Sequence, residues 1–71
     1  MEWHHLNEES WAYGEAGRYH VRPEMAEGFT GWRVDLVSRG GRSSRLVGVS
    51  PSDRMVVRMA ERHNRAQRGD L

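Results

Sequence analysis

Residues 32–49, with the sequence WRVDLVSRGGRSSRLVGV, carry the strongest structural signal of the chain. Trp32, Val34 and Leu36 alternate with Arg33 and Asp35, and the segments 32–38 and 43–49 flank Arg39-Gly40-Gly41-Arg42. Alternation with a period of two is typical of strands that bury one face, and Gly-Gly suits a two-residue type I′ turn. We therefore expect an antiparallel hairpin whose turn is Gly40-Gly41.

The turn also predicts the register of this hairpin, because Arg39 must then lie opposite Arg42. The pairs that share one side are Trp32 with Val49, Val34 with Val47, and Leu36 with Arg45. This side is mostly apolar, whereas the other side receives charged, polar and apolar residues. One apolar side and one mixed side are expected when a helix covers only one face of a sheet.

A helix is predicted directly after the hairpin. Ser50 is a natural N-cap, Pro51 suits the first helical position, and Asp53 completes a sequence that resembles a capping box. Gly69 is typical of the position just beyond a helix C-terminus. We expect the helix to run from Pro51 to Arg68, which is roughly 27 Å at 1.5 Å per residue.

The residues before the hairpin predict further strands. Residues 11–22 alternate in character, and Gly14 and Gly17 mark a turn or a bulge between two short strands. Pro23 should end the extended segment, so that residues 23–31 form a loop. Residues 1–10 show neither period, and both a helical turn and a strand stay open for them.

These elements predict one small α+β domain over residues 1–71, in which an antiparallel sheet of three or more strands is covered on one face by a C-terminal helix (β-β-β-α). Its expected parts are an N-terminal arm (1–10), the sheet (11–49), the helix (50–68) and a tail (69–71). Its expected core consists of Trp32, Val34, Val47, Val49, Met55 and Met59.

The composition excludes several classes of protein. The chain has 71 residues and no cysteine, which excludes a disulfide framework, a thiolate zinc site and a cysteine nucleophile. No apolar run approaches the roughly 18 residues that a membrane span needs, and no signal-peptide core follows Met1. We therefore expect a cytoplasmic protein that does not act at a membrane.

Charge is distributed unevenly along the chain. Residues 1–38 carry seven acidic residues and three arginines, for a net charge of −4, whereas residues 39–71 carry three acidic residues and eight arginines, for a net charge of +5. All eleven basic residues are arginine, which suits interfaces because it pairs bidentately with carboxylates and phosphates. The basic half predicts an anionic partner, unless the two halves attract each other within one fold.

On a helical wheel, five arginines of the predicted helix fall within an arc of about 120° opposite its apolar face. They are Arg54, Arg58, Arg62, Arg65 and Arg68, called the Arg stripe below. Glu61 lies within the same arc and can pair with Arg58 or Arg65. The functional interpretation is a docking face for carboxylates or phosphates, and the structural alternative is a solvated helix face.

No pattern of reactive side chains indicates catalysis. The four histidines, His4, His5, His20 and His63, lack a compact ligand spacing such as HExxH. The serines fall in expected turns, caps and strand ends without a paired base, and the stretch SRGGRSS lacks the lysine and the spacing of a phosphate-binding loop. We therefore expect no enzyme activity, no cofactor and no metal site.

The strand sequence Gly31-Trp32-Arg33-Val34, the basic hairpin and the single helix resemble, in architecture, the arm-type DNA-binding domain of tyrosine integrases over about residues 18–68. In that family the sheet enters the major groove, so this resemblance implies DNA binding. The Lys-free, Arg- and Gly-rich composition and the ending MAERHNRAQRG (59–69) are similar to short orphan proteins of actinobacteria and their phages. This second resemblance implies a phage protein that modulates a host protein.

The favoured interpretation is a small non-enzymatic regulator that docks on a macromolecular partner, with an acidic protein surface as the expected partner. The alternative is a nucleic-acid-binding module that uses the Arg-rich hairpin and helix. The predicted partner-binding residues are Arg54, Arg58, Arg62, Arg65, Arg68, Arg39 and Arg42. A homodimer is compatible with the charge pattern, because the acidic half of one copy can meet the basic half of another.

Overall fold

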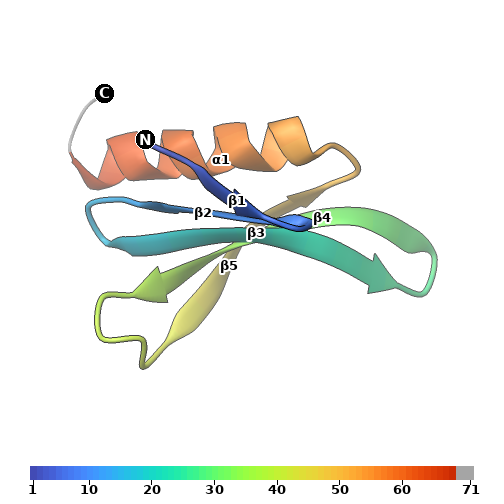
Figure 1. Cartoon of the computed structure of the whole chain (residues 1–71), viewed down its shortest axis with the longest axis horizontal. Coiled ribbons are helices and arrows are strands. Elements are labelled where there is room, and N and C mark those ends of the chain that lie inside the picture. The colour runs from blue at the N-terminus through green and yellow to red at the C-terminus, as the bar shows by residue number, and fades with distance from the viewer. Residues whose placement is uncertain (69–71) are drawn as a thin grey trace.

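Five antiparallel strands are followed by one helix in the computed structural model, which describes residues 1–68. The elements are β1 (His4–Leu6), β2 (Glu9–Tyr13), β3 (Gly17–Ala26), β4 (Phe29–Ser38), β5 (Ser44–Ser50) and α1 (Asp53–Gln67). The strands pair in chain order, β1-β2-β3-β4-β5, and α1 lies across one face of the twisted sheet (Figure 1). The predicted α+β fold, with a sheet of three or more strands and one C-terminal helix, is confirmed.

The β4–β5 hairpin has the predicted register near its loop and a different one beyond a bulge. Leu36 pairs with Arg45 as predicted, but Val34 pairs with Gly48 rather than Val47, and Trp32 pairs with Ser50 rather than Val49. The register shifts between Val34 and Asp35, where β5 contains one extra residue. A bulge of this kind increases the local twist, and residue alternation alone does not reveal it.

The predicted two-residue type I′ turn at Gly40-Gly41 is wrong. The Ser38 N–H donates to the Ser43 carbonyl at 2.9 Å, so four residues, 39–42, form the loop. The Gly41 N–H donates to the Ser38 carbonyl at 2.8 Å, and Gly41 has a φ of 72°. Gly40 does not have a positive φ, whereas a type I′ turn needs one at both central residues.

The turn between β2 and β3 is confirmed, because the Gly14 N–H donates to the Gly17 carbonyl at 2.7 Å. The predicted loop over residues 23–31 is wrong. Strand β3 continues through Pro23, which pairs with Trp32, and it reaches Ala26 opposite Phe29. Proline is tolerated there because the pairing of β2 with β3 ends at Val21, which leaves the end of β3 with a neighbouring strand on one side only.

The first ten residues are not a separate arm. Strand β1 pairs with β2 from His4 opposite Trp11 to Leu6 opposite Glu9. Asn7 in the connecting turn has a φ of 57°, a conformation that asparagine adopts more readily than most residues. Residues 1–10 therefore extend the sheet by one edge hairpin, which the irregular sequence pattern did not predict.

Helix α1 begins two residues later than predicted. Its N-cap is Ser52 rather than Ser50, and Asp53 is its first residue. The Ser50 hydroxyl instead accepts a hydrogen bond from the Ser52 N–H at 3.2 Å, which holds the link between β5 and α1. The predicted stop at Gly69 and the predicted tail (69–71) lie outside the described residues.

The core lies between α1 and the sheet. Its buried cluster consists of Tyr19, Val21, Val34, Leu36, Val56 and Ala60, with Trp3, Trp32, Val47 and Met59 among the side chains packed against it. The prediction that Val49 and Met55 belong to the core is wrong, because these side chains are 42% and 43% exposed. Val49 pairs with Arg33 after the bulge and so lies on the sheet face away from α1, whereas Met55 lies at the margin of the buried face of α1.

Candidate docking surface

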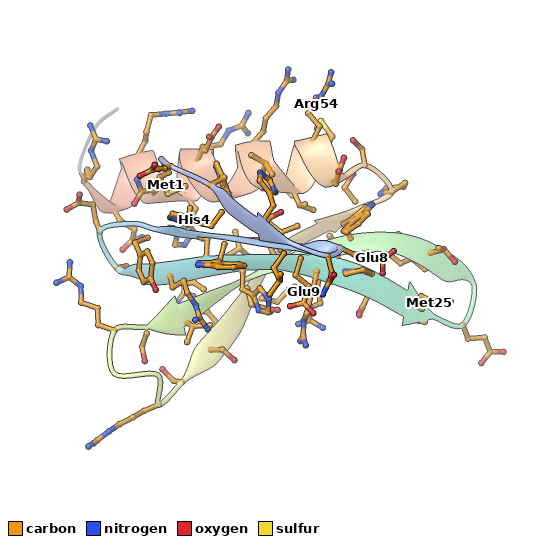
Figure 2. All side chains as sticks on the ribbon, viewed as in Figure 1. Met1, His4, Glu8, Glu9, Met25 and Arg54 are labelled. Atoms are coloured by element: carbon orange, nitrogen blue, oxygen red, sulfur yellow. The ribbon has the colours of Figure 1, made fainter. Side chains whose placement is uncertain are left out.

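The Arg stripe lies on the exposed side of α1. All five of its arginines are exposed, and Figure 2 shows Arg54 on the side of the helix that faces away from the sheet. The opposite side of α1 buries Val56, Ala60 and Asn64. From Arg54 to Arg65 the row is roughly 16 Å long at 1.5 Å per residue. The helix therefore presents its cations along one continuous face.

Four members of the stripe lack partners within residues 1–68. Arg54, Arg58, Arg62 and Arg65 have neither an ion pair nor a side-chain hydrogen bond there. The predicted pairing of Glu61 with Arg58 or Arg65 is wrong. Glu61 Oε2 instead accepts a hydrogen bond from Trp3 Nε1 at 3.2 Å. The only carboxylate predicted within the stripe is thus engaged with the N-terminal segment.

Four ion pairs of the described chain lie within residues 9–35. His20 Nε2 lies 2.6 Å from Glu9 Oε1, and Arg22 lies 3.6 Å from Asp35. Arg33 contacts Asp35 at 2.8 Å and Glu24 at 3.4 Å. The hydrogen bonds to Asp35 raise the pKa of the Arg33 guanidinium above its usual range. Asp35 and Glu24 of the first half are therefore paired with arginines of the same half.

Arg39 and Arg42 are not part of the same surface as the stripe. They lie in the loop of the β4–β5 hairpin, which projects from the sheet away from α1 (Figure 1). Arg39 Nη2 donates to the Glu15 carbonyl at 2.7 Å and so ties this loop to the β2–β3 turn. The structure thus separates the seven predicted partner-binding residues into the five of the helix and the two of the loop.

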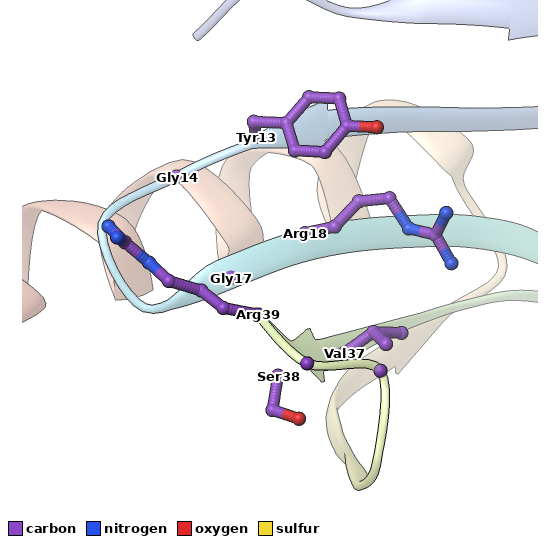
Figure 3. A pocket seen from close by; sticks show the side chains of 9 residues that line it. Tyr13, Gly14, Gly17, Arg18, Val37, Ser38 and Arg39 are labelled. Carbon is purple, nitrogen blue, oxygen red and sulfur yellow. The ribbon is translucent and has the colours of Figure 1, made fainter.

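A hollow of about 510 Å³ lies between that loop and the β2–β3 turn (Figure 3). Tyr13, Arg18, Val37 and the two loop glycines are among the residues that line it. The Nε atom of Arg18 is buried without a hydrogen-bond partner within residues 1–68. Arg18 is therefore a cation at the hollow without an ion pair among the described residues, and sequence analysis missed it because Arg18 belongs to no charge cluster along the chain.

The four histidines are dispersed. His63 Nδ1 and the Tyr19 hydroxyl are hydrogen-bonded at 2.6 Å, and burial raises the pKa of that hydroxyl. His4 stacks on Trp11 with ring centroids 5.8 Å apart, and His5 contacts the Ser10 hydroxyl at 2.7 Å. Within residues 1–68, no three histidine, aspartate or glutamate side chains come close enough to hold a metal ion. Each histidine thus has a different structural neighbour.

No protein-family model, curated protein or solved structure matches the chain. Within the described part of the chain, no helix is both long and apolar enough to cross a membrane. The candidate site is therefore inferred from the arrangement of its residues in the structure. It is a helical face with four exposed, unpaired arginines.

Proposed function

We propose that this chain is a small non-enzymatic binding protein that docks through the Arg stripe on an acidic surface of a partner protein. The observation that carries the proposal is the row Arg54, Arg58, Arg62 and Arg65, exposed and without ion pairs in the described structure. Like charges spaced three and four residues apart destabilise a helix. Carboxylates of a partner would relieve this repulsion, and guanidinium groups bind them bidentately.

A nucleic acid is the alternative partner for the same cations, and the integrase resemblance would place it on the sheet. The outer face of the sheet favours this less, because Arg22 and Arg33 are already paired with the nearly buried Asp35. Phosphates would have to displace that carboxylate. An acidic protein surface on α1 requires no such exchange, and it agrees with the resemblance to phage proteins that modulate a host protein.

The test is the double charge reversal Arg58→Glu with Arg62→Glu. Both side chains are exposed, so we expect the melting temperature to change little, since surface substitutions usually alter stability by no more than about 0.5 kcal/mol. The matched control is Arg39→Glu with Arg42→Glu, which makes the same change in net charge on the hairpin loop. Partner proteins are captured from an actinobacterial lysate, with and without nuclease treatment, and quantified by mass spectrometry.

We expect a partner that wild type and the loop variant retain and that the helix variant loses. Equal capture by the helix variant would contradict the proposal. Capture that disappears with nuclease would instead favour the nucleic-acid alternative. In that case, binding to duplex DNA should weaken steeply between two salt concentrations, because each phosphate contact releases counterions.

A second copy of the chain is one partner with suitable chemistry, because acidic side chains such as Glu2, Glu8 and Glu27 have no ion pair within residues 1–68. We expect such a homodimer to strengthen at low salt, where exposed charges are screened least. Light scattering at high protein concentration measures it directly. A monomeric mass at low salt would exclude the homodimer, and the proposed partner would then be a different protein.

A further inference from the structure

An apolar groove runs beside the Arg stripe, between α1 and the edge strand β5. Its volume is about 440 Å³, and its lining residues are Val47, Met55, Arg58, Met59, Arg62, His63 and Ala66. Strand β5 ends the sheet, so no further strand covers this side of the helix. Met55 is 43% exposed, although the apolar pattern of the helix predicted that it would be buried. The fold thus leaves apolar side chains uncovered directly beside the unpaired arginines.

The shape of the groove depends on the bulged part of β5. Val47 lies at the bulge and packs against the core, while Gly48 lies beneath Met59. A Cβ atom at Gly48 would overlap the Met59 sulfur, so the missing side chain allows Met59 to lie over the strand. Methionine side chains are flexible and polarisable, and they adapt to the shape of an apolar ligand. The groove is therefore suited to accept apolar side chains from outside.

The charge around the groove has one sign. Arg58 and Arg62 both line the groove and belong to the Arg stripe, and neither has an ion pair within residues 1–68. None of the described residues that line it is acidic. A ligand that covers the apolar groove must therefore pass beside two cations of α1, and negative charges beside its apolar residues would complement them.

We propose that the groove binds an amphipathic acidic helix of the partner, whose apolar face enters between α1 and β5 while its carboxylates pair with Arg58 and Arg62. The proposal rests on the proposed function, since it takes the Arg stripe as the docking face, and it adds the kind of partner segment. From Met55 to Ala66 the groove follows α1 for roughly 16 Å, which accommodates apolar residues at positions i, i+3 or i+4, and i+7 of a second helix.

Two other occupants fit less well. The phosphate backbone of a nucleic acid would meet the cations but would bring no aliphatic side chain to cover Met55. The α1 helix of a second copy would place its own arginines against the same arginines, and like charges across an interface disfavour binding. An acidic helix with one apolar face meets both requirements of the groove.

The experiment measures the fluorescence anisotropy of three labelled synthetic peptides of equal length and charge. The first has leucines at positions i, i+4 and i+7 flanked by glutamates, the second has the same residues scrambled so that no apolar face forms, and the third has serine in place of leucine. The variant Met55→Gln tests the groove, because this exposed position tolerates a polar side chain of similar size. The matched control is Met25→Gln, a methionine that is 80% exposed at the far end of the β3–β4 hairpin (Figure 2).

We expect the amphipathic peptide to bind more tightly than the scrambled one, and Met55→Gln to weaken it about tenfold while Met25→Gln leaves it unchanged. Arg58→Gln with Arg62→Gln should weaken all three peptides. Equal binding of the first two peptides would overturn the groove proposal, and so would the absence of an effect of Met55→Gln. In either case, the proposed function would stand if the arginine variant still weakened binding. If the arginine variant binds every peptide like wild type, both proposals fail.

A labelled duplex oligonucleotide and the self-association of the protein are measured with the same variants. Met55→Gln should change neither. An oligonucleotide that binds more tightly than the amphipathic peptide and is weakened by Met55→Gln would overturn the proposal in favour of a nucleic acid. A dimer that Met55→Gln dissociates, in a protein that ignores the peptide, would overturn it in favour of a second copy.

Discussion

At the scale of single residues, Asn64 is the buried polar side chain that joins the helix to the β2–β3 turn. Its Oδ1 accepts a hydrogen bond from the Glu15 N–H at 2.8 Å, and a Cβ atom at Gly14 would overlap this oxygen, so position 14 has no room for a side chain. Asn64→Ala removes the acceptor and leaves that N–H without its partner. We expect a loss of about 1–3 kcal/mol in the free energy of unfolding, measured with urea.

The control for Asn64 is Gln67→Ala, which removes the same kind of amide from an exposed position of the same helix. It should change the free energy of unfolding by no more than about 0.5 kcal/mol. Equal midpoints for wild type and Asn64→Ala would show that the hydrogen bond does not stabilise the turn.

The buried hydroxyl of Tyr19 should make the stability of the fold depend on pH. Burial raises the pKa of its hydroxyl above the usual 10.0, and the positive charge of Arg45 offsets this only in part. A hydroxyl with a higher pKa in the folded than in the unfolded state contributes stability below about pH 10 and loses it as the pH rises through the folded pKa. The free energy of unfolding should therefore fall at alkaline pH, and more steeply than in Tyr19→Phe. Parallel pH profiles of the two proteins would contradict this.

At the scale of elements, two adjacent residues of α1 differ sharply in burial. Val56 is fully buried against the sheet, whereas Met55 is half-exposed in the groove. Val56→Ala should destabilise the protein by about 2 kcal/mol, because it removes two buried methyl groups and leaves a cavity. Met55→Ala should cost less than about 1 kcal/mol. Thermal unfolding followed by circular dichroism compares the two, and a larger loss for Met55→Ala would mean that α1 packs in a different rotation.

At the scale of the whole molecule, Trp3 connects the first segment of the chain to the last element. Its Nε1–H donates to Glu61 on α1, and its ring packs against the core cluster. Trp3→Ala should lower the free energy of unfolding by about 2 kcal/mol, since this ring is partly buried. Tyr13→Ala, which truncates an exposed ring on β2, is the control. Separate transitions in fluorescence and circular dichroism would show that β1 and α1 do not unfold together.

Sequence patterns alone predict the class of fold, the two strands around residues 39–42, the turn at Gly14–Gly17 and the exposed Arg stripe. These features depend on local rules, namely alternation, turn residues and helical periodicity, which act over a few neighbouring residues. For the same reason, the sequence pattern wrongly ends the strand at Pro23 and leaves the conformation of residues 1–10 undecided. Their extended conformation depends on the strands beside them and not on their own preferences.

Tertiary contacts determine which charges are paired and where apolar surface stays exposed. The bulge in β5 turned Val49 outward, placed Gly48 under Met59 and so shaped the groove beside α1. Glu61 contacts Trp3, 58 residues away, instead of the arginines on its own helix. Contacts of this range depend on how the sheet twists and where its edge falls, and neither is encoded in the spacing of nearby residues.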